Sequence, residues 1–305
     1  MKKVLITGAS GMLGATLVSL WQDKYTVFAT GGSDFPANPA RNYKVFDLSQ
    51  DNYRDLAKVF NPEYIIHSAA MTNVELCERI PQKAMNTNGE SVKKLLDVFT
   101  KSKLIFISSD KVFAPNTHLA TEKDPVNPTT VYGKSKVLGE KYILQSPTQS
   151  MSVRTVIVGK NINKNKNSSL AEWIVNSLLR KQHITLFSDV VFTPISIWHF
   201  ASELSWLIEN YSTVKNIKIL HIAGAEIISK YDFGYNLAKK LKLDTKLITQ
   251  GSIEKLTLMI NTHKDLTLDS KEYEKLSCRM LPKSARSISI LVKNFINRDE
   301  NFKNR

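Results

Sequence analysis

The feature that most constrains the fold is a glycine-rich turn between a short apolar run and a helix-like segment. Residues 3–7 are apolar and β-branched, which is typical of a buried strand in a parallel sheet. The turn contains Gly8, Gly11 and Gly14, and residues 15–21 follow at helical spacing. We expect Gly8 to allow the tight turn, Gly11 to let a pyrophosphate approach the backbone, and Gly14 to let the helix pack close to the strand. The segment therefore predicts a dinucleotide-binding strand–turn–helix unit.

Further strand-like runs alternate with helix-like segments along the first half of the chain. The expected strands after the first are residues 25–30, 43–46, 64–67, 103–108 and 152–158. The expected helices are residues 50–60, 86–101 and a segment opening near Tyr132. Such alternation predicts an α/β fold, a doubly wound parallel sheet of the Rossmann type with a smaller C-terminal substrate lobe.

The chain is long enough for a main domain and a smaller lobe. We expect a dinucleotide-binding Rossmann domain over residues 1–155, to which a strand near 217–222 returns. A discontinuous substrate-binding lobe would occupy residues 156–285, and residues 286–305 would form a basic tail. The substrate cleft would lie between the two parts, at the carboxyl ends of the strands.

Composition excludes several classes of protein. Apolar residues make up 42% of the chain, so it is not wholly disordered, and no run of about 18 apolar residues predicts a membrane helix. Cys77 and Cys278 are the only cysteines, which excludes a disulfide scaffold and fits a reducing, cytoplasmic setting. The histidines lack metal-ligand spacing, so we expect no metal site.

The chain is strongly basic, with 42 Lys and Arg residues against 28 Asp and Glu residues and a net charge of +14. These residues are spread along the chain without a helix-turn-helix or zinc-finger pattern, which argues against a nucleic-acid partner. A basic cleft would suit phosphorylated small molecules, and much of the charge has a simpler interpretation as a solvated surface.

The end of the second predicted strand bears on the cofactor. NAD-binding folds place an acidic residue about 20 residues after the first glycine, where it binds the adenosine ribose. Residues 28–33 contain no Asp or Glu, and the first acid is Asp34. Thr30 and Ser33 leave room for a 2′-phosphate, and Arg41 lies within loop reach. We therefore expect NADP(H) to be preferred, with NAD(H) possible.

A second constellation carries the candidate chemistry. Tyr132 and Lys136 are four residues apart, so on a helix their side chains share one face. A nearby ammonium is expected to lower the phenol pKa of about 10 and make Tyr132 a usable acid or base. Ser109, at the end of the strand near 103–108, could hold a substrate carbonyl beside that tyrosine.

With these motifs the sequence resembles the extended short-chain dehydrogenases/reductases, and within them the dTDP-4-dehydrorhamnose reductase branch. The resemblance covers the chain to about residue 275. It is carried by residues 7–14, 45–48, 66–70, 86–89, 107–113, 132–136 and 139–140.

The resemblance implies a role for each matching position. Ser109 would orient a sugar carbonyl, Tyr132 would donate the proton, and Lys136 would bind the nicotinamide ribose. The implied cofactor contacts are Gly8, Ser10, Gly11, Met12, Leu13, Gly14, Thr30, Asp47, Leu48, Ala69, Ala70, Tyr132 and Lys136. The implied substrate contacts are Ser109, Asp110, Lys111 and Ile157.

The sequence departs from the branch at several positions. Lys111 stands where the branch usually has a tyrosine, and Ile157 stands where it usually has a tryptophan, so the sugar stays open. His67 precedes the alanines where the family prefers asparagine, and we interpret it as a core histidine. The basic loop 160–166 is either a diphosphate contact or a solvated loop.

These observations favour an NAD(P)H-dependent reductase of a nucleotide-linked 4-keto sugar, with the hydride from the nicotinamide and the proton from Tyr132. Two alternatives stay open, a nucleotide-sugar epimerase or dehydratase and a non-catalytic dinucleotide-binding regulatory subunit. The expected partner is the nucleotide-sugar substrate, and a homodimer is left open as the assembly.

Overall fold

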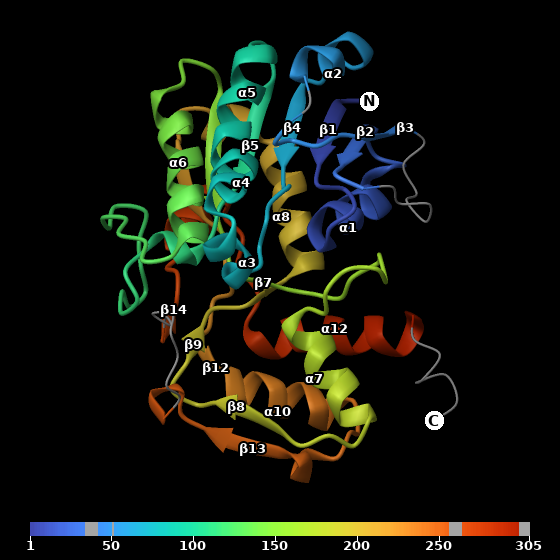
Figure 1. The fold of residues 1–305 in the computed structure, drawn as a ribbon, viewed down its shortest axis with the longest axis vertical. Coiled ribbons are helices and arrows are strands. Elements are labelled where there is room, and N and C mark those ends of the chain that lie inside the picture. Colours follow the sequence, from blue (N-terminus) through green and yellow to red (C-terminus); the bar gives the residue numbers. More distant parts are fainter. Residues whose placement is uncertain (34–41, 51, 256–263, 299–305) are drawn as a thin grey trace.

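A computed structural model of the chain describes residues 1–33, 42–50, 52–255 and 264–298. A seven-stranded sheet lies between two layers of helices, and a smaller lobe of helices and short strands lies beside the carboxyl ends of its strands (Figure 1). The strand order is β11-β6-β5-β4-β1-β2-β3, and every neighbouring pair is parallel. The predicted doubly wound parallel sheet is thus confirmed.

The strands of this sheet fall close to the apolar runs of the sequence. They are β1 (Lys3–Thr7), β2 (Thr26–Gly31), β3 (Asn42–Val45), β4 (Tyr64–His67), β5 (Lys103–Ile107), β6 (Ser150–Arg154) and β11 (Ile219–His221). The last of them pairs with β6 and extends the sheet by one strand, although the chain has passed through the lobe in between.

Successive side chains along each strand point to opposite faces of the sheet, and different helices cover the two faces. Val4 and Ile6 belong to one apolar cluster, and Leu5 between them belongs to another. The helices over the first face are α1 (Met12–Trp21) and α8 (Ile197–Glu209). Those over the second are α2 (Tyr53–Val59), α5 (Ser91–Val98) and α6 (Val131–Gln145). Both faces are therefore buried, as the continuous apolar strands require.

Two local predictions need correction. The predicted strand 152–158 is divided, because β6 ends at Arg154 and the chain leaves the sheet. Its continuation, β7 (Ile157–Val158), pairs instead with β10 (Ile195–Ser196). β6 is buried throughout and β7 is apolar and largely buried, so the sequence pattern did not show the break.

The second correction concerns the predicted helix 86–101. It begins as a π-helical turn, η1 (Asn86–Glu90), continues as α5, and ends at Val98. Two short helices before it, α3 (Val74–Arg79) and α4 (Pro81–Met85), were not predicted. The start of α3 had a local signal, because the side chain of Asn73 accepts a hydrogen bond from the Leu76 amide.

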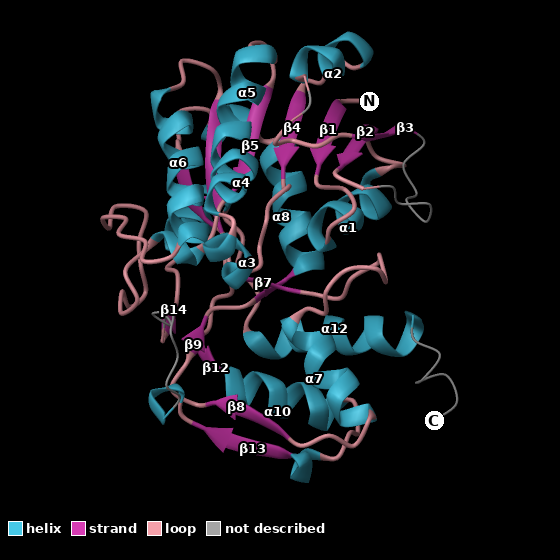
Figure 2. Cartoon of the chain, viewed as in Figure 1, coloured by secondary structure: helices cyan, strands magenta, loops and turns pink. Residues whose placement is uncertain are grey.

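In the smaller lobe, helices lie beside short strands (Figure 2). Its apolar cluster includes Phe192, Phe233 and Leu291. Its helices are α7 (Leu170–Leu179), α10 (Lys230–Lys240) and α12 (Ser284–Arg298). Its strands form the parallel pair β8 (Ile184–Phe187) and β13 (Ile248–Gly251), and the sheet of β12 (Ile228–Ser229), β9 (Val191–Phe192) and β14 (Asp265–Leu266).

The remaining described elements are short connections or small helices. They are α9 (Tyr211–Val214), α11 (Lys271–Ser277), η2 (Asp110–Val112), η3 (Thr245–Leu247) and η4 (Ile253–Lys255).

The segment expected as a basic tail begins inside helix α12. Ile288 and Phe295 are buried in the core of the lobe, because the apolar residues of this segment recur on one helical face. Residues 299–305 lie outside the described part of the chain. Within that part, no helix is both long and apolar enough to cross a membrane.

A close backbone approach determines how β1 leads into α1. Gly8 has a φ of +72°, and a Cβ at this position would lie 2.5 Å from the Cα of Ala69. A Cβ at Gly14 would lie 2.3 Å from the carbonyl oxygen of Gly8. Only glycines fit here, so the start of α1 sits directly on the ends of β1 and β4.

We predict that Gly8→Ala lowers the free energy of unfolding by about 2–4 kcal/mol, because it adds both left-handed strain and a clash with Ala69. Gly32→Ala is the matched control, since a Cβ there meets nothing within 4 Å. Urea unfolding of both variants measures the difference. Equal stabilities would show that the backbone at Gly8 adapts without strain.

Candidate active site

The three residues expected to carry the chemistry lie together at the carboxyl end of β5. Ser109 follows this strand, and Tyr132 and Lys136 come from the first turns of α6. The helix begins after Thr130, whose side chain accepts a hydrogen bond from the Gly133 amide. All three functional side chains are buried, at 7%, 9% and 2% exposure respectively.

Lys136 is tied to the sheet rather than to an acid. Its Nζ donates to the carbonyl oxygen of Ile107 at 2.9 Å and lies 6.0 Å from the ring centroid of Tyr132. Burial lowers the pKa of Lys136 to about 7, while the charge of Glu140 acts in the opposite direction. Its ammonium therefore becomes neutral more readily than that of an exposed lysine.

The expected lowering of the Tyr132 pKa is wrong for this structure. Burial raises the pKa of Tyr132, the charge of Asp110 raises it further, and the neighbouring Ser109 hydroxyl only partly opposes them. Desolvation wins because the ionised phenol would lose its contact with water. Tyr132 is consequently held as a neutral phenol, the form that can donate a proton.

Ser109 has hydrogen-bond contacts on both sides. Its Oγ donates to Oδ1 of Asp110 at 2.7 Å and accepts from the backbone amide of Lys111 at 3.2 Å. These contacts hold the hydroxyl at the N-terminus of η2, beside Tyr132.

A buried asparagine attaches α6 to the loop after β4. Asn88 lies in η1, and its Oδ1 accepts from the Met71 amide at 2.7 Å. Its Nδ2 donates to the Ser135 hydroxyl at 2.9 Å, next to Lys136. The motif at 86–89 therefore acts by positioning the helix that carries the candidate catalytic pair.

A buried ion pair fixes the same helix to β6. Arg154 donates through Nε and a terminal nitrogen to the two carboxylate oxygens of Glu140, at 2.9 and 2.7 Å. Both side chains are almost fully buried, and a bidentate geometry of this kind offsets part of the desolvation penalty.

The glycine-rich turn has the features that a dinucleotide pyrophosphate requires. Gly11 precedes α1 without a side-chain cap, so the first amides of that helix have no side-chain acceptor. The first turn carries no acidic residue, which suits an anion at the positive end of the helix dipole. The residues present therefore fit a phosphorylated cofactor.

The other expected cofactor residues lie around this turn and along the edge toward β3. Leu13, Leu48 and Ala69 are buried, whereas Met12 and Ala70 are half-buried.

Further along this edge, Asp47 accepts from the backbone amide and the hydroxyl of Ser49, which lower its pKa. Thr30 is buried in β2, opposite Thr7 of β1. Asp34 and Arg41, which the sequence analysis also considered, lie outside the described residues.

His67 is a structural histidine, as interpreted from the sequence. It is fully buried, with Nδ1 2.7 Å from the Thr7 hydroxyl and Nε2 2.8 Å from the Ser91 hydroxyl. Burial lowers its pKa to about 3, and the charge of Lys136 acts in the same direction. Both ring nitrogens are occupied, so His67 has no atom left for chemistry.

Two approaches between distant segments were not predicted from the sequence. Asn163, in the basic loop 160–166, is buried and donates from Nδ2 to the Ser10 carbonyl at 3.2 Å, so this loop touches the glycine-rich turn. Lys164 and Lys166 in the same loop are exposed. The second contact brings Lys230 of the lobe near Asp110 and Lys111. Neither contact had a local signal, because each joins distant segments.

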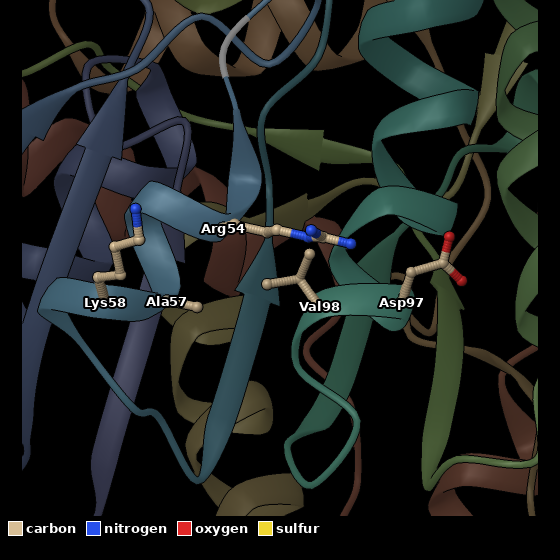
Figure 3. Close-up of a pocket in the computed structure, with 5 residues that line it drawn as sticks. All are labelled: Arg54, Ala57, Lys58, Asp97 and Val98. Atoms are coloured by element: carbon tan, nitrogen blue, oxygen red, sulfur yellow. The ribbon is translucent and has the colours of Figure 1, made fainter.

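A hollow lies between α2 and α5, where side chains of both helices line it (Figure 3). It has a volume of about 380 Å³ and is lined by Arg54, Ala57, Lys58, Asp97 and Val98. Val98 precedes β5, so the hollow is near the amino ends of the strands, opposite the candidate active site. No group of three or more His, Cys, Asp or Glu side chains is arranged for a metal ion in the described ranges.

Fold and site together define a Rossmann-type nucleotide-binding protein with the Ser–Tyr–Lys arrangement of the extended short-chain dehydrogenases/reductases. A family model described as the RmlD substrate binding domain matches residues 1–296. The chain belongs to this family and is a dTDP-4-dehydrorhamnose-reductase-like protein.

Curated relatives cover much of the chain. The spore coat polysaccharide biosynthesis protein SpsK of Bacillus subtilis is 29% identical over 82% of this chain and 83% of that protein. A dTDP-4-dehydrorhamnose reductase of Aggregatibacter actinomycetemcomitans is 28% identical over 76% of this chain and 77% of that protein. Methionine adenosyltransferase 2 subunit beta of Danio rerio is 31% identical, over 55% of this chain and 52% of that protein.

A solved structure has the same fold. The dTDP-4-dehydrorhamnose reductase of Bacillus anthracis, in complex with NADP, superposes with a TM-score of 0.84 over 96% of this chain and all of that chain. Its sequence identity is 19%, so the likeness shows the arrangement of elements rather than the substrate.

We predict that acid destabilises the protein partly through His67. The unfolded chain binds a proton at this histidine near pH 6.5, but the folded chain does so only near pH 3, so stability falls as pH drops between these values. His67→Gln should flatten the dependence of unfolding free energy on pH by up to about 1.4 kcal/mol per unit. Urea unfolding at pH 7, 6 and 5 measures this slope. The exposed His183→Gln is the control, and an unchanged slope in His67→Gln would contradict the prediction.

Proposed function

We propose that the chain is an NADPH-dependent reductase of a nucleotide-linked 4-keto sugar. The observation that carries the proposal is the buried Tyr132, which lies beside Ser109 and has the Lys136 ammonium 6.0 Å from its ring centroid. In this proposal residues 1–155 hold the cofactor, and the lobe over 156–285 holds the nucleotide-sugar. Membership of the RmlD substrate-binding family supports the substrate class.

Each of the three residues would perform one task. The Ser109 hydroxyl would donate a hydrogen bond to the sugar carbonyl oxygen and fix it beside Tyr132. The Tyr132 hydroxyl would pass its proton to that oxygen as the carbonyl becomes an alcohol. The Lys136 ammonium, held on Ile107, would offset the negative charge left on the tyrosine and contact the cofactor ribose. When bound, the reduced nicotinamide supplies the hydride.

The preference for NADPH rests on the end of β2. No carboxylate occurs in residues 26–33, and this segment ends in Gly31, Gly32 and Ser33. Lys44 of β3 pairs with Thr30 of β2 and adds a positive charge at this edge. These features favour a 2′-phosphate over a free ribose hydroxyl.

We predict that NADPH binds several-fold more tightly than NADH, because residues 26–33 offer hydroxyls and no carboxylate, and Lys44 adds a positive charge beside them. Ser33→Asp should make NADH the more tightly bound cofactor, because it places a negative charge beside the 2′-phosphate of NADPH. Isothermal titration calorimetry measures the four dissociation constants. Tighter binding of NADH by the unmodified protein would contradict the assignment.

A non-catalytic regulatory role is the second candidate. It is favoured by the relative named methionine adenosyltransferase 2 subunit beta, although this chain spans about half of that protein. Such a role would need a bound dinucleotide but no proton donor. The epimerase or dehydratase alternative is weaker, since Lys111 stands beside Asp110 where an acidic pair would be needed.

We predict that Tyr132→Phe lowers kcat for reduction of a nucleotide-linked 4-keto sugar by about 10²–10⁴-fold, because it removes the proton donor but keeps the buried ring. NADPH affinity should be nearly unchanged. Tyr142→Phe, on the same helix but bonded to Glu90, is the matched control. The measurement is steady-state oxidation of NADPH with each variant.

The same experiment separates the candidates. Full activity in Tyr132→Phe would refute the proposed mechanism. If the unmodified protein binds NADPH but reduces no uridine- or thymidine-linked 4-keto sugar, the regulatory role is favoured instead.

A further inference from the structure

Lys111 lies immediately beside the candidate catalytic residues. It is two residues after Ser109 in η2, and its backbone amide donates to the Ser109 hydroxyl. A Cβ at Gly133 would lie 2.3 Å from the carbonyl oxygen of Lys111, so this turn packs directly against the start of α6, next to Tyr132. The position of the Lys111 backbone is thereby fixed within the site.

Lys230 approaches the same place from the lobe. It is the first residue of α10, and its backbone amide donates to the Val190 carbonyl at 2.9 Å. Its Nζ lies 3.4 Å from the ring centroid of Phe192, an interaction that favours the charged form. The side chain is half-buried, so its ammonium is neither fully hydrated nor sealed in the core.

The charges around these two lysines do not balance. Val112, the residue after Lys111, and Phe192, under the Lys230 ammonium, pack in the same apolar cluster, so the two lysines approach each other there. The charges of Asp110 and Lys111 act on Lys230, so two lysine side chains share one carboxylate. Asp110 is already engaged, because its Oδ1 accepts from Ser109. Within the described residues, neither lysine ammonium has a hydrogen bond or an ion pair to a carboxylate. Burial lowers the pKa of Lys111, and burial together with the charge of Lys111 lowers that of Lys230 to about 7.

We propose that Lys111 and Lys230 bind a carboxylate substituent of the sugar, beside the carbonyl that is reduced. An anion here would supply the partner that both ammonium groups lack, in a half-buried setting where charge-assisted hydrogen bonds are strong. Because Lys111 lies close to Ser109, the anion that it binds belongs to the sugar and not to the distant part of the nucleotide. The inference rests on the proposed function and narrows its substrate to a nucleotide-linked sugar acid.

Binding of stable nucleotide-sugars tests this without turnover. The probes are UDP-glucuronate and UDP-glucose, and the same pair linked to dTDP, because the members of each pair differ only in the C6 carboxylate. Calorimetry on the NADP-saturated protein should show the uronate binding at least about tenfold more tightly, which corresponds to 1.4 kcal/mol. Lys111→Met and Lys230→Met should each remove most of this preference, and Lys111→Arg should retain part of it. The exposed Lys134→Met and Lys239→Met are controls.

The outcomes are distinct. Equal affinity for both members of a pair would overturn the inference and leave the proposed function intact. A uniform loss of affinity for both members in the lysine variants would assign the lysines to the diphosphate and would also overturn it. If no probe binds and no 4-keto sugar is reduced, the proposed function fails, and the inference fails with it.

Discussion

The contact between the backbone of Gly8 and Ala69 is the constraint on which the site depends. It requires a left-handed residue without a side chain at the end of β1, and it brings the ends of β1 and β4 together under the start of α1. Gly14 continues the same close packing one helical turn later. Because the helix begins at this point, its unpaired amides are directed to the edge where the strands end. The cofactor cradle is therefore a product of backbone packing rather than of side-chain chemistry.

The side of the site formed by α6 is held in place by buried charged groups. Lys136 is held by a backbone carbonyl, and Glu140, one turn further along α6, is held by Arg154 of β6. Removing charged groups from water is unfavourable, and Lys136, Glu140 and Arg154 each have a defined partner. The same desolvation keeps Tyr132 protonated. In the proposed mechanism the tyrosine carries its proton until the substrate arrives, and burial favours that protonated form.

The lobe brings its own charged residues to the edge of the candidate site. Residues beside Ser109 belong to the loop after β5, whereas α10 begins in the lobe. Lys111 and Lys230 stand at these two places, and the charge of Lys111 acts on Lys230 across the boundary between sheet and lobe. Asn163 adds a third connection, from the lobe-side loop to the Ser10 carbonyl. The glycine-rich turn and the lobe side of the chain are thus joined by a contact between distant segments.

The sequence by itself determined the features that depend on local pattern. Glycines between a strand and a helix predicted the turn at residues 8–14, and four-residue spacing placed Tyr132 and Lys136 on one helical face. Only the tertiary structure decided that strand 152–158 divides, that the pKa of Tyr132 rises, and that Lys230 lies near Lys111. The periodicity of apolar residues predicts helices and strands and the faces that they bury. It does not predict how deeply a group is desolvated or which remote charge lies beside it, because both depend on segments that meet only after folding.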